Sequence, residues 1–184
     1  MLEITVPRIE GFNDVTGEFV IICEETKLLL EHSLLSMAKW ESKWHKPFLD
    51  NHKRHTTEET VDYIRCMTIS PKNVKKDVYY NIPQNLMDKI TDYIDDSMTA
   101  TWFHNDSSKG TSSAIVTSEI VYYWMITYNV PFDPCEKWHL NRLMTLIRVC
   151  SEKNSPKKKM TREEIMERNR RLNEQRRAEM NSKG

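Results

Sequence analysis

Residues 56–68 read Thr-Thr-Glu-Glu-Thr-Val-Asp-Tyr-Ile-Arg-Cys-Met-Thr, and this stretch decides the class of fold. Thr56 with Glu59 three residues later forms the capping box that starts a helix. Val61, Ile64 and Met67 then recur at the spacing of one helical face. The stretch therefore predicts an amphipathic helix that packs one side onto a core.

Similar patterns predict helices on both sides of this one. Ser33 can cap a helix that runs to about His45, and a later helix is predicted to start at Pro83. The apolar residues 117–128 predict a buried helix. The order Asp133-Pro134-Cys135-Glu136 is typical of a helix start, with Asp as the cap and Pro as the first residue, so a helix is predicted from there to about residue 150.

Strands are predicted in the first 32 residues. Leu2–Val6 alternates apolar and polar residues, and Glu18–Cys23 is apolar and rich in β-branched residues. Thr26–Glu31 is expected to pair with Glu18–Cys23 as a hairpin across Glu24-Glu25. The predicted fold is mainly α (α+β), with a small β element of two or three strands over residues 1–32 and a helical bundle over residues 33–152.

An extended C-terminal arm is predicted over residues 153–184. A hinge containing Pro156 precedes a second capping box at Thr161, and the helix that follows can run to about Met180. Only four of its residues are large and apolar, which is too few to hold the helix onto the body by burial. The chain has 27 basic and 27 acidic residues; the arm has 11 basic and 5 acidic, so its net charge is +6 and that of the body is −6.

This charge separation predicts contact with an acidic surface, and three interpretations of the arm stay open. Lys157-Lys158-Lys159 can bind phosphates of a nucleic acid or form a nuclear import motif. Acids interleaved with bases over residues 162–177 favour a helix that docks on a protein, including an acidic body of a second copy. The arm can also be a solvated tail without a partner.

The sequence has no recognisable catalytic motif, which predicts a non-enzymatic protein without a cofactor. Cys135 and His139 lie four residues apart on a predicted helix, but a zinc site needs three or four ligands. His45, His52 and His55 lie near Asp50 without the ordered spacing of a metal motif. These residues are expected to be a core thiol beside a partly buried histidine and a solvated loop, so no metal site is predicted.

Trp102 and Phe103 differ from the other aromatic residues, which recur at helical spacing and are expected in the core. They lie beside the polar stretch of residues 104–113, so they are predicted to be exposed and to form a contact patch. With the arm they give the full predicted set of partner-binding residues. This set is Trp102, Phe103, Lys157, Lys158, Lys159, Arg162, Ile165, Arg168, Leu172, Arg176 and Arg177.

The location is predicted to be intracellular. The four cysteines form no CxxC motif, so reduced thiols are expected. The N-terminal residues lack the basic start and apolar core of a signal peptide. The longest apolar run, residues 120–126, is too short to cross a bilayer, so no membrane partner is predicted.

Several segments together resemble a family of small proteins encoded by tailed bacteriophages, and the likeness covers nearly the whole chain. The segments are residues 36–42 with 47–49, 63–67, 98–103, 117–125 and 138–147, together with the basic tail that ends at Arg176-Arg177 and Lys183-Gly184. Some members are described as tail assembly chaperones or tail-region proteins. The resemblance implies no catalytic residues in this chain.

The resemblance implies synthesis in the cytoplasm of an infected bacterium and work through protein contacts with tail or other virion proteins. A chaperone of this kind would keep tail-tube subunits or the tape-measure protein soluble before assembly, and the protein can also belong to the finished virion. A nucleic-acid-binding accessory protein of a phage, with the basic arm on phosphates, is the alternative.

Overall fold

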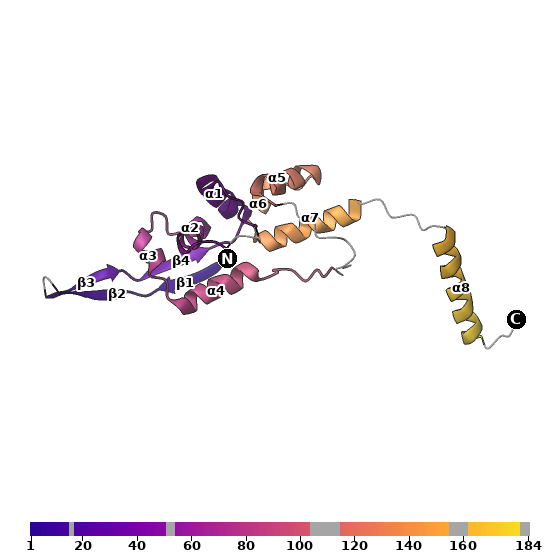
Figure 1. Cartoon of the computed structure of the whole chain (residues 1–184), viewed down its shortest axis with the longest axis horizontal. Coiled ribbons are helices and arrows are strands. Elements are labelled where there is room, and N and C mark those ends of the chain that lie inside the picture. The colour runs from indigo at the N-terminus through magenta and orange to yellow at the C-terminus, as the bar shows by residue number, and fades with distance from the viewer. Residues whose placement is uncertain (15–16, 51–53, 104–114, 155–161, 181–184) are drawn as a thin grey trace. The chain divides into compact units, whose positions relative to one another are not determined.

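The computed structural model describes residues 1–14, 17–50, 54–103, 115–154 and 162–180. The chain divides into a body, Met1–Ser151, and a second compact unit, Glu152–Gly184. Within the described residues the fold is mainly helical, with small antiparallel sheets near the N-terminus, as the sequence predicted (Figure 1). The strands are β1 (Leu2–Val6), β2 (Ile9–Asn13), β3 (Glu18–Cys23), β4 (Thr26–Leu30) and β5 (Thr68–Ser70).

The helices follow the first four strands in the chain. They are α1 (Leu34–Trp44), α2 (Thr57–Met67), α3 (Lys76–Tyr80), α4 (Gln84–Asp95), α5 (Ser118–Thr127), α6 (Phe132–Cys135), α7 (Leu140–Asn154) and α8 (Arg162–Glu179). No helix of the described residues combines the length and the apolar character that crossing a bilayer requires.

The strands form two separate sheets, and the predicted pairing of β3 with β4 is wrong. One sheet has the order β1-β4-β5, and the other is the two-stranded ribbon β2-β3, all antiparallel. In the first sheet Ile4 lies opposite Leu28, and both side chains are buried. β4 buries alternate residues as β1 does, whereas β3 buries only Cys23, so the two strands that can share one core face pair with each other.

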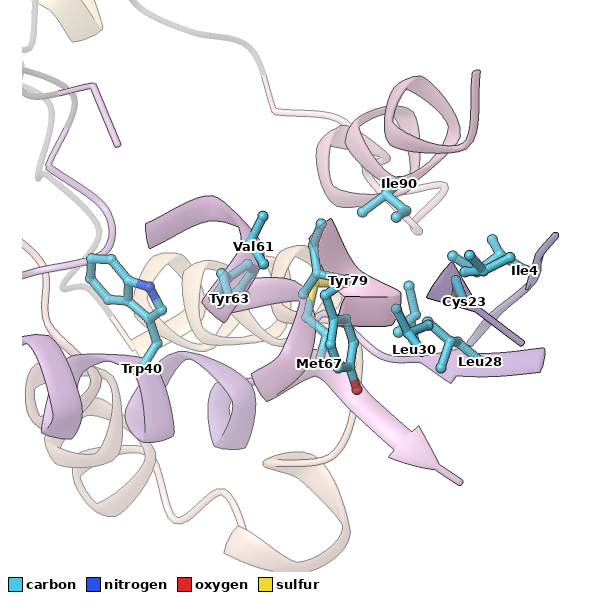
Figure 2. Packing of buried hydrophobic residues seen from close by; sticks show 13 residues of the cluster. Ile4, Cys23, Leu28, Leu30, Trp40, Val61, Tyr63, Met67, Tyr79 and Ile90 are labelled. Atoms are coloured by element: carbon cyan, nitrogen blue, oxygen red, sulfur yellow. The ribbon is translucent and has the colours of Figure 1, made fainter. Parts of the chain in front are cut away.

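The first hydrophobic cluster lies where helices cover the β1-β4-β5 sheet. Figure 2 shows Leu28 and Leu30 of β4 near Ile4, with Ile90 of α4 on one side and Met67 and Tyr79 beside them. Trp40 of α1 extends the cluster toward α2, where its indole Nε1 donates to the Glu59 carbonyl at 2.9 Å. The predicted helical stripe Val61, Ile64 and Met67 is buried in this cluster, so the prediction from residues 56–68 is confirmed.

The second hydrophobic cluster packs α5 and α7 against the first turns of α1. Its fully buried members include Leu34 and Met37 of α1, Val121 of α5 and Leu143 of α7. α1 therefore contributes residues to both clusters and joins the two halves of the body.

The predicted caps at the starts of α1 and α2 are confirmed. The Ser33 side chain accepts a hydrogen bond from the Ser36 amide, and Thr56 with Glu59 makes both hydrogen bonds of the capping box. α1 ends at His45, which adopts the left-handed conformation (φ 53°) and donates its amide to the Glu41 carbonyl.

The prediction that a long helix starts at Pro134 is wrong. Asp133 has φ −90° and ψ 126° inside the short α6, and the long helix α7 starts only at Leu140. The Leu140 amide donates to the His32 carbonyl at 2.7 Å, and a bridge joins Ser33 to His139. These long-range hydrogen bonds set the start of α7, and a local cap at Asp133 does not.

Helix α5 forms as predicted over Ser118–Thr127, but the prediction that it is buried is wrong. Val121 and Met125 are buried, whereas Tyr123 and Ile126 are exposed. One side of the helix is thus apolar without being covered by the described part of the body.

A buried carboxylate connects α1 to α5. Glu41 Oε2 accepts hydrogen bonds from the Ser118 amide at 2.8 Å and the Ser118 hydroxyl at 2.5 Å. Its Oε1 accepts from the Phe48 amide at 2.8 Å. A carboxylate at a helix N-terminus satisfies free amides there and is favoured by the helix dipole.

Candidate protein-binding surfaces

The ribbon β2-β3 exposes apolar side chains along most of its length, and we call it the hairpin (residues 9–13 and 18–23). In Figure 1 it extends beyond the helices of the body. Phe19 is 75% exposed, the highest fraction among the large apolar residues of the ribbon. The other exposed large apolar residues are Phe12, Val20, Ile21 and Ile22. In the part of the chain that the structure describes, cover is found at the base of the hairpin, where Cys23 is buried and β3 contacts α3.

Both faces of the hairpin are apolar. Phe12 lies opposite Phe19, and their rings meet edge to face with centroids 5.2 Å apart. The register shift between Ile9 and Glu10 leaves Ile22 on the face that carries Gly11. A Cβ on Gly11 would lie 2.6 Å from Ile22 Cδ1. The Ile22 side chain therefore fills space that is open only because residue 11 is a glycine. Neither face is therefore directed into the body as a core face would be.

A cleft lies at the end of the β1-β4-β5 sheet, and we call it the end-of-sheet cleft. It has a volume of about 790 Å³ and lies between the start of α1, strand β5, the end of α4 and the start of α7. Its apolar lining includes Leu35, Met67, Ile69, Met98 and Trp138.

Four basic side chains line the same cleft: Lys39, Lys72, Lys137 and Arg142. Lys137 forms an ion pair with Asp133. The Arg142 guanidinium lies over the Trp138 ring, 4.4 Å from its centroid. Lys39 and Lys72 have no acidic partner among the residues that the structure describes.

Glu31 brings a negative charge to the cleft wall, in contact with Tyr93. The Tyr93 hydroxyl donates to Glu31 Oε1 at 2.7 Å. Burial and this carboxylate raise the pKa of Tyr93 above its ordinary value, so the hydroxyl remains a donor at neutral pH.

Two buried histidines, His32 and His139, lie next to this part of the cleft. His32 Nδ1 and the Tyr63 hydroxyl are 2.6 Å apart, and the rings of His32 and His139 lie 5.0 Å apart. Burial, with a smaller effect of His139, lowers the pKa of His32 to about 3. His32 is therefore neutral at physiological pH and acts as a structural residue.

The predicted contact residues Trp102 and Phe103 have different surroundings. Trp102 is 92% exposed, whereas Phe103 is half-buried beneath the Arg148 guanidinium, 4.0 Å from its ring centroid. Phe103 also lines a groove of about 520 Å³ with Trp124 and Met144. The structure thus exposes one of the two predicted side chains fully and the other only in part.

The arm residues that the structure describes lie on α8 in the second unit. Ile165 and Leu172 fall seven residues apart on one side of the helix, and Leu172 is 39% exposed. The predicted binding residues Arg162, Arg168, Arg176 and Arg177 are also exposed. Lys157, Lys158 and Lys159, and the predicted cap at Thr161, lie outside the described residues.

Some of the charged residues of α8 form ion pairs with one another. Arg170 pairs with Glu174 at 3.1 Å and Arg171 with Glu167 at 3.5 Å, each across four residues. Such pairs favour the helix by a few tenths of a kcal/mol each.

No group of three or more potential metal ligands gathers within the described residues. Cys135 and His139 are both buried, and His139 Nε2 hydrogen-bonds to the Tyr93 carbonyl at 2.9 Å. His55 stacks on Phe48, and His52 lies outside the described residues. Burial raises the pKa of the Cys135 thiol, which makes its thiolate less available.

The hairpin and the end-of-sheet cleft were both missed by reasoning from sequence. A sign of the hairpin was present, because Phe12, Phe19 and Ile21 are apolar and lie in strands bounded by acidic residues and Gly17. The cleft had no such sign, because its lining comes from segments far apart in the sequence, from Met1 to Arg142.

Comparison with known proteins gives no relative: no family model, no curated protein and no solved structure matches this chain.

Proposed function

We propose that the protein is a non-enzymatic assembly factor that acts through protein–protein contacts, with bacteriophage tail or other virion proteins as its partners. The observation that carries the proposal is the hairpin, which exposes large apolar side chains on both faces. A contiguous exposed apolar surface is typical of a site that a partner covers.

The hairpin also packs against little of the described part of its own chain. A two-stranded ribbon in water is marginally stable at best, and three or more strands or a packed helix are usually needed. Here α3 contacts β3 near the base of the hairpin, where Cys23 is buried. A partner that buries Phe12, Phe19 and Ile21 would supply the missing cover.

Helix α8 adds a second surface of the same kind. Its exposed apolar residues Ile165 and Leu172 lie along a helix that is otherwise charged. A narrow apolar stripe of this type supports helix-in-groove docking on a partner.

The choice of virion proteins rests on the resemblance of residues 36–42 with 47–49, 63–67, 98–103, 117–125 and 138–147 to small phage proteins. On this basis the role is that of a tail assembly chaperone or a tail-region structural protein. It would act in the host bacterial cytoplasm or in the virion.

Co-expression with the tail-tube subunit and the tape-measure protein of the same phage tests the proposal. The double substitution of Phe19→Ser and Ile21→Thr should lower co-purification of the client by about tenfold, because it removes apolar area at a contact. The matched control changes Tyr123→Ser and Ile126→Thr, which are also exposed apolar residues, on α5. Unchanged co-purification in the hairpin variant contradicts the proposal.

Deletion of residues 155–184 tests the contribution of the arm. The body should stay folded, because it forms a compact unit of its own, and client binding should be lost or strongly weakened. Full retention of the client excludes the arm as the docking element. Self-association through the arm and an acidic body would be seen as a dimer that this deletion abolishes.

Nucleic-acid binding is the second candidate, and the exposed arginines of α8 favour it. Binding through phosphates would weaken steeply with salt, with a slope that reflects the number of contacts. DNA mobility shifts measured from low to physiological salt test this candidate. No shift at low salt, or a flat salt response, removes it.

A further inference from the structure

We infer that the end-of-sheet cleft binds an acidic peptide segment that also carries an apolar side chain, supplied by a partner protein. The inference deepens the proposed function and rests on it, since it states the chemistry of one partner contact. Its test uses purified protein and short peptides, so it can succeed or fail separately from client binding.

The size and lining of the cleft suit a short stretch of peptide. Its volume of about 790 Å³ lies within the usual range for a ligand site. The apolar residues Leu35, Ile69 and Met98 offer contacts to one or two apolar side chains. Met98 and Ile69 are themselves more than one-third exposed, so this area is open to solvent when the cleft is empty of a peptide.

The charges of the cleft identify the ligand as acidic. Lys39, Lys72 and Arg142 come from α1, from the segment after β5 and from α7, so three separate segments bring basic groups to one site. None of the three has an acidic partner among the described residues. This concentration of positive charge is found within residues 1–152, whose net charge is −6, so it is not a consequence of average composition.

Arg142 is the basic residue of the cleft best suited to a carboxylate. Its guanidinium lies over the Trp138 ring, 4.4 Å from the centroid, and the side chain is exposed. A planar guanidinium binds a carboxylate through two parallel N–H donors. The contact with Trp138 already restricts the Arg142 side chain, so the side chain loses less conformational entropy when a ligand binds.

A peptide fits this site better than a nucleic acid. Glu31 lines the cleft, where its carboxylate pairs with the Met1 amino group at 3.0 Å and accepts a hydrogen bond from Tyr93, so a continuous phosphate backbone would lie near a carboxylate. Most of the apolar residues are Met, Leu and Ile, which do not form the flat stacking surfaces that bases prefer, and the Arg142 guanidinium lies over the ring of Trp138. Separate carboxylates on a peptide can reach the three basic groups and avoid Glu31.

Fluorescence anisotropy with the full chain and three labelled twelve-residue peptides tests the inference. One peptide alternates Glu with Leu and Phe, the second replaces the apolar residues by Ser, and the third replaces Glu by Lys. We expect saturable binding of the first peptide, weaker binding of the second by about tenfold or more, and no binding of the third. Equal binding of the first two peptides, or no binding of the first, overturns the inference.

Charge variants locate the binding. Lys39→Gln with Lys72→Gln should weaken the first peptide by about tenfold, and the affinity that is left should depend less on salt. The control is Lys27→Gln with Lys89→Gln, two exposed lysines that do not line the cleft. An equal loss in the control would show attraction by overall charge and overturns the inference. The inference is also overturned if a single-stranded oligonucleotide binds more tightly than the first peptide and the cleft variant abolishes that binding.

Methyl NMR of the methionines gives a readout that needs no charge substitution. The Met98 methyl signal should shift on titration with the first peptide, because Met98 lines the cleft. The signal of Met180, in the second unit, should stay unchanged. Met98→Leu identifies the signal. Binding without a shift at Met98 would place the peptide elsewhere and overturns the inference.

Discussion

The two antiparallel strand pairs β1-β4 and β2-β3 are built from similar residues and meet opposite environments. Ile4, Leu28 and Leu30 of the first pair are buried under helices, whereas Phe19 and Ile21 of the second are exposed. The helices α2 and α4 contribute Ile64 and Ile90 to the core over the first pair. The comparison shows that the cover supplied by other elements, more than the apolar content of a strand, decides whether it supports stability or is available to a partner.

The largest expected effect that tests this comparison is on the free energy of unfolding. Leu28→Ala should lower it by about 3 kcal/mol, because the truncation leaves a cavity in the first cluster. Ile21→Ala on the hairpin should change it by less than about 0.5 kcal/mol, because that side chain is exposed. Urea denaturation followed by circular dichroism measures both. A loss from Ile21→Ala as large as that from Leu28→Ala would contradict the division into covered and uncovered pairs.

The next effect concerns the hydrogen bonds that hold the covering helices. Glu41→Ala should lower the free energy of unfolding by about 2 to 3 kcal/mol, because the Phe48 and Ser118 amides lose a buried acceptor. Glu3→Ala, an exposed carboxylate on β1, is the control and should have little effect. Thermal unfolding compares the two variants. Equal melting temperatures would show that the Glu41 hydrogen bonds do not stabilise the contact between α1 and α5.

A smaller effect follows from acid. The folded protein holds the pKa of His32 at about 3, below the ordinary 6.5, so only the unfolded chain takes up this proton as pH falls below 6.5. The contribution of His32 to the free energy of unfolding is fully present above pH 6.5 and is lost progressively as the pH falls toward 3. Between pH 6.5 and 5 the loss should be about 1.5 kcal/mol.

The variant His32→Asn isolates this contribution, because it removes the titrating group at the side of Tyr63. Denaturant midpoints of both proteins at pH 6.5 and 5 should show a smaller acid loss in the variant. The same acid loss in both proteins would assign it to other groups, such as the carboxylates of Glu59 and Asp62. Their pKa values are lowered: that of Glu59 by hydrogen bonds from Lys46 and Thr56, and that of Asp62 by hydrogen bonds that outweigh its burial.

The smallest expected effect is confined to the hairpin. Gly11→Val places a Cβ where Ile22 Cδ1 now lies, so Ile22 must move. The end of a flexible side chain moves at little cost, and the free energy of unfolding should change by about 0.5 kcal/mol or less. Amide NMR shifts should change along β2 and β3 and not at β4. Changes that spread to β4 would show that the hairpin is coupled to the covered pair more tightly than its contacts indicate.

Features that depend on neighbouring residues could be predicted from the sequence. The capping interactions of Ser33 and Thr56 involve residues three positions away, and both helices start where predicted. The fold class followed from these helices and from the alternating strand Leu2–Val6. The exposure of Trp102 was also predicted, since a polar stretch follows it.

Features that depend on distant residues could not be predicted. β4 pairs with β1 across more than twenty residues, because Leu28 and Ile4 share a core face, and a pattern of single strands does not state its partner. The residues near Asp133 have the composition of a helix start, but His32 and Ser33 provide the hydrogen bonds that place it at Leu140. The cleft combines segments from α1 to α7, so only the folded chain shows its charge.

The position of α1 between the two hydrophobic clusters has a consequence for how the body opens. Trp40 lies in the first cluster, and Leu34 and Met37 lie in the second, so separation of either half from α1 exposes buried apolar side chains of α1 to water. The two halves should consequently unfold as one cooperative unit. In hydrogen exchange, the amides of α1 should exchange only through opening of the whole body, and those of β2 and β3 through far more frequent local fraying.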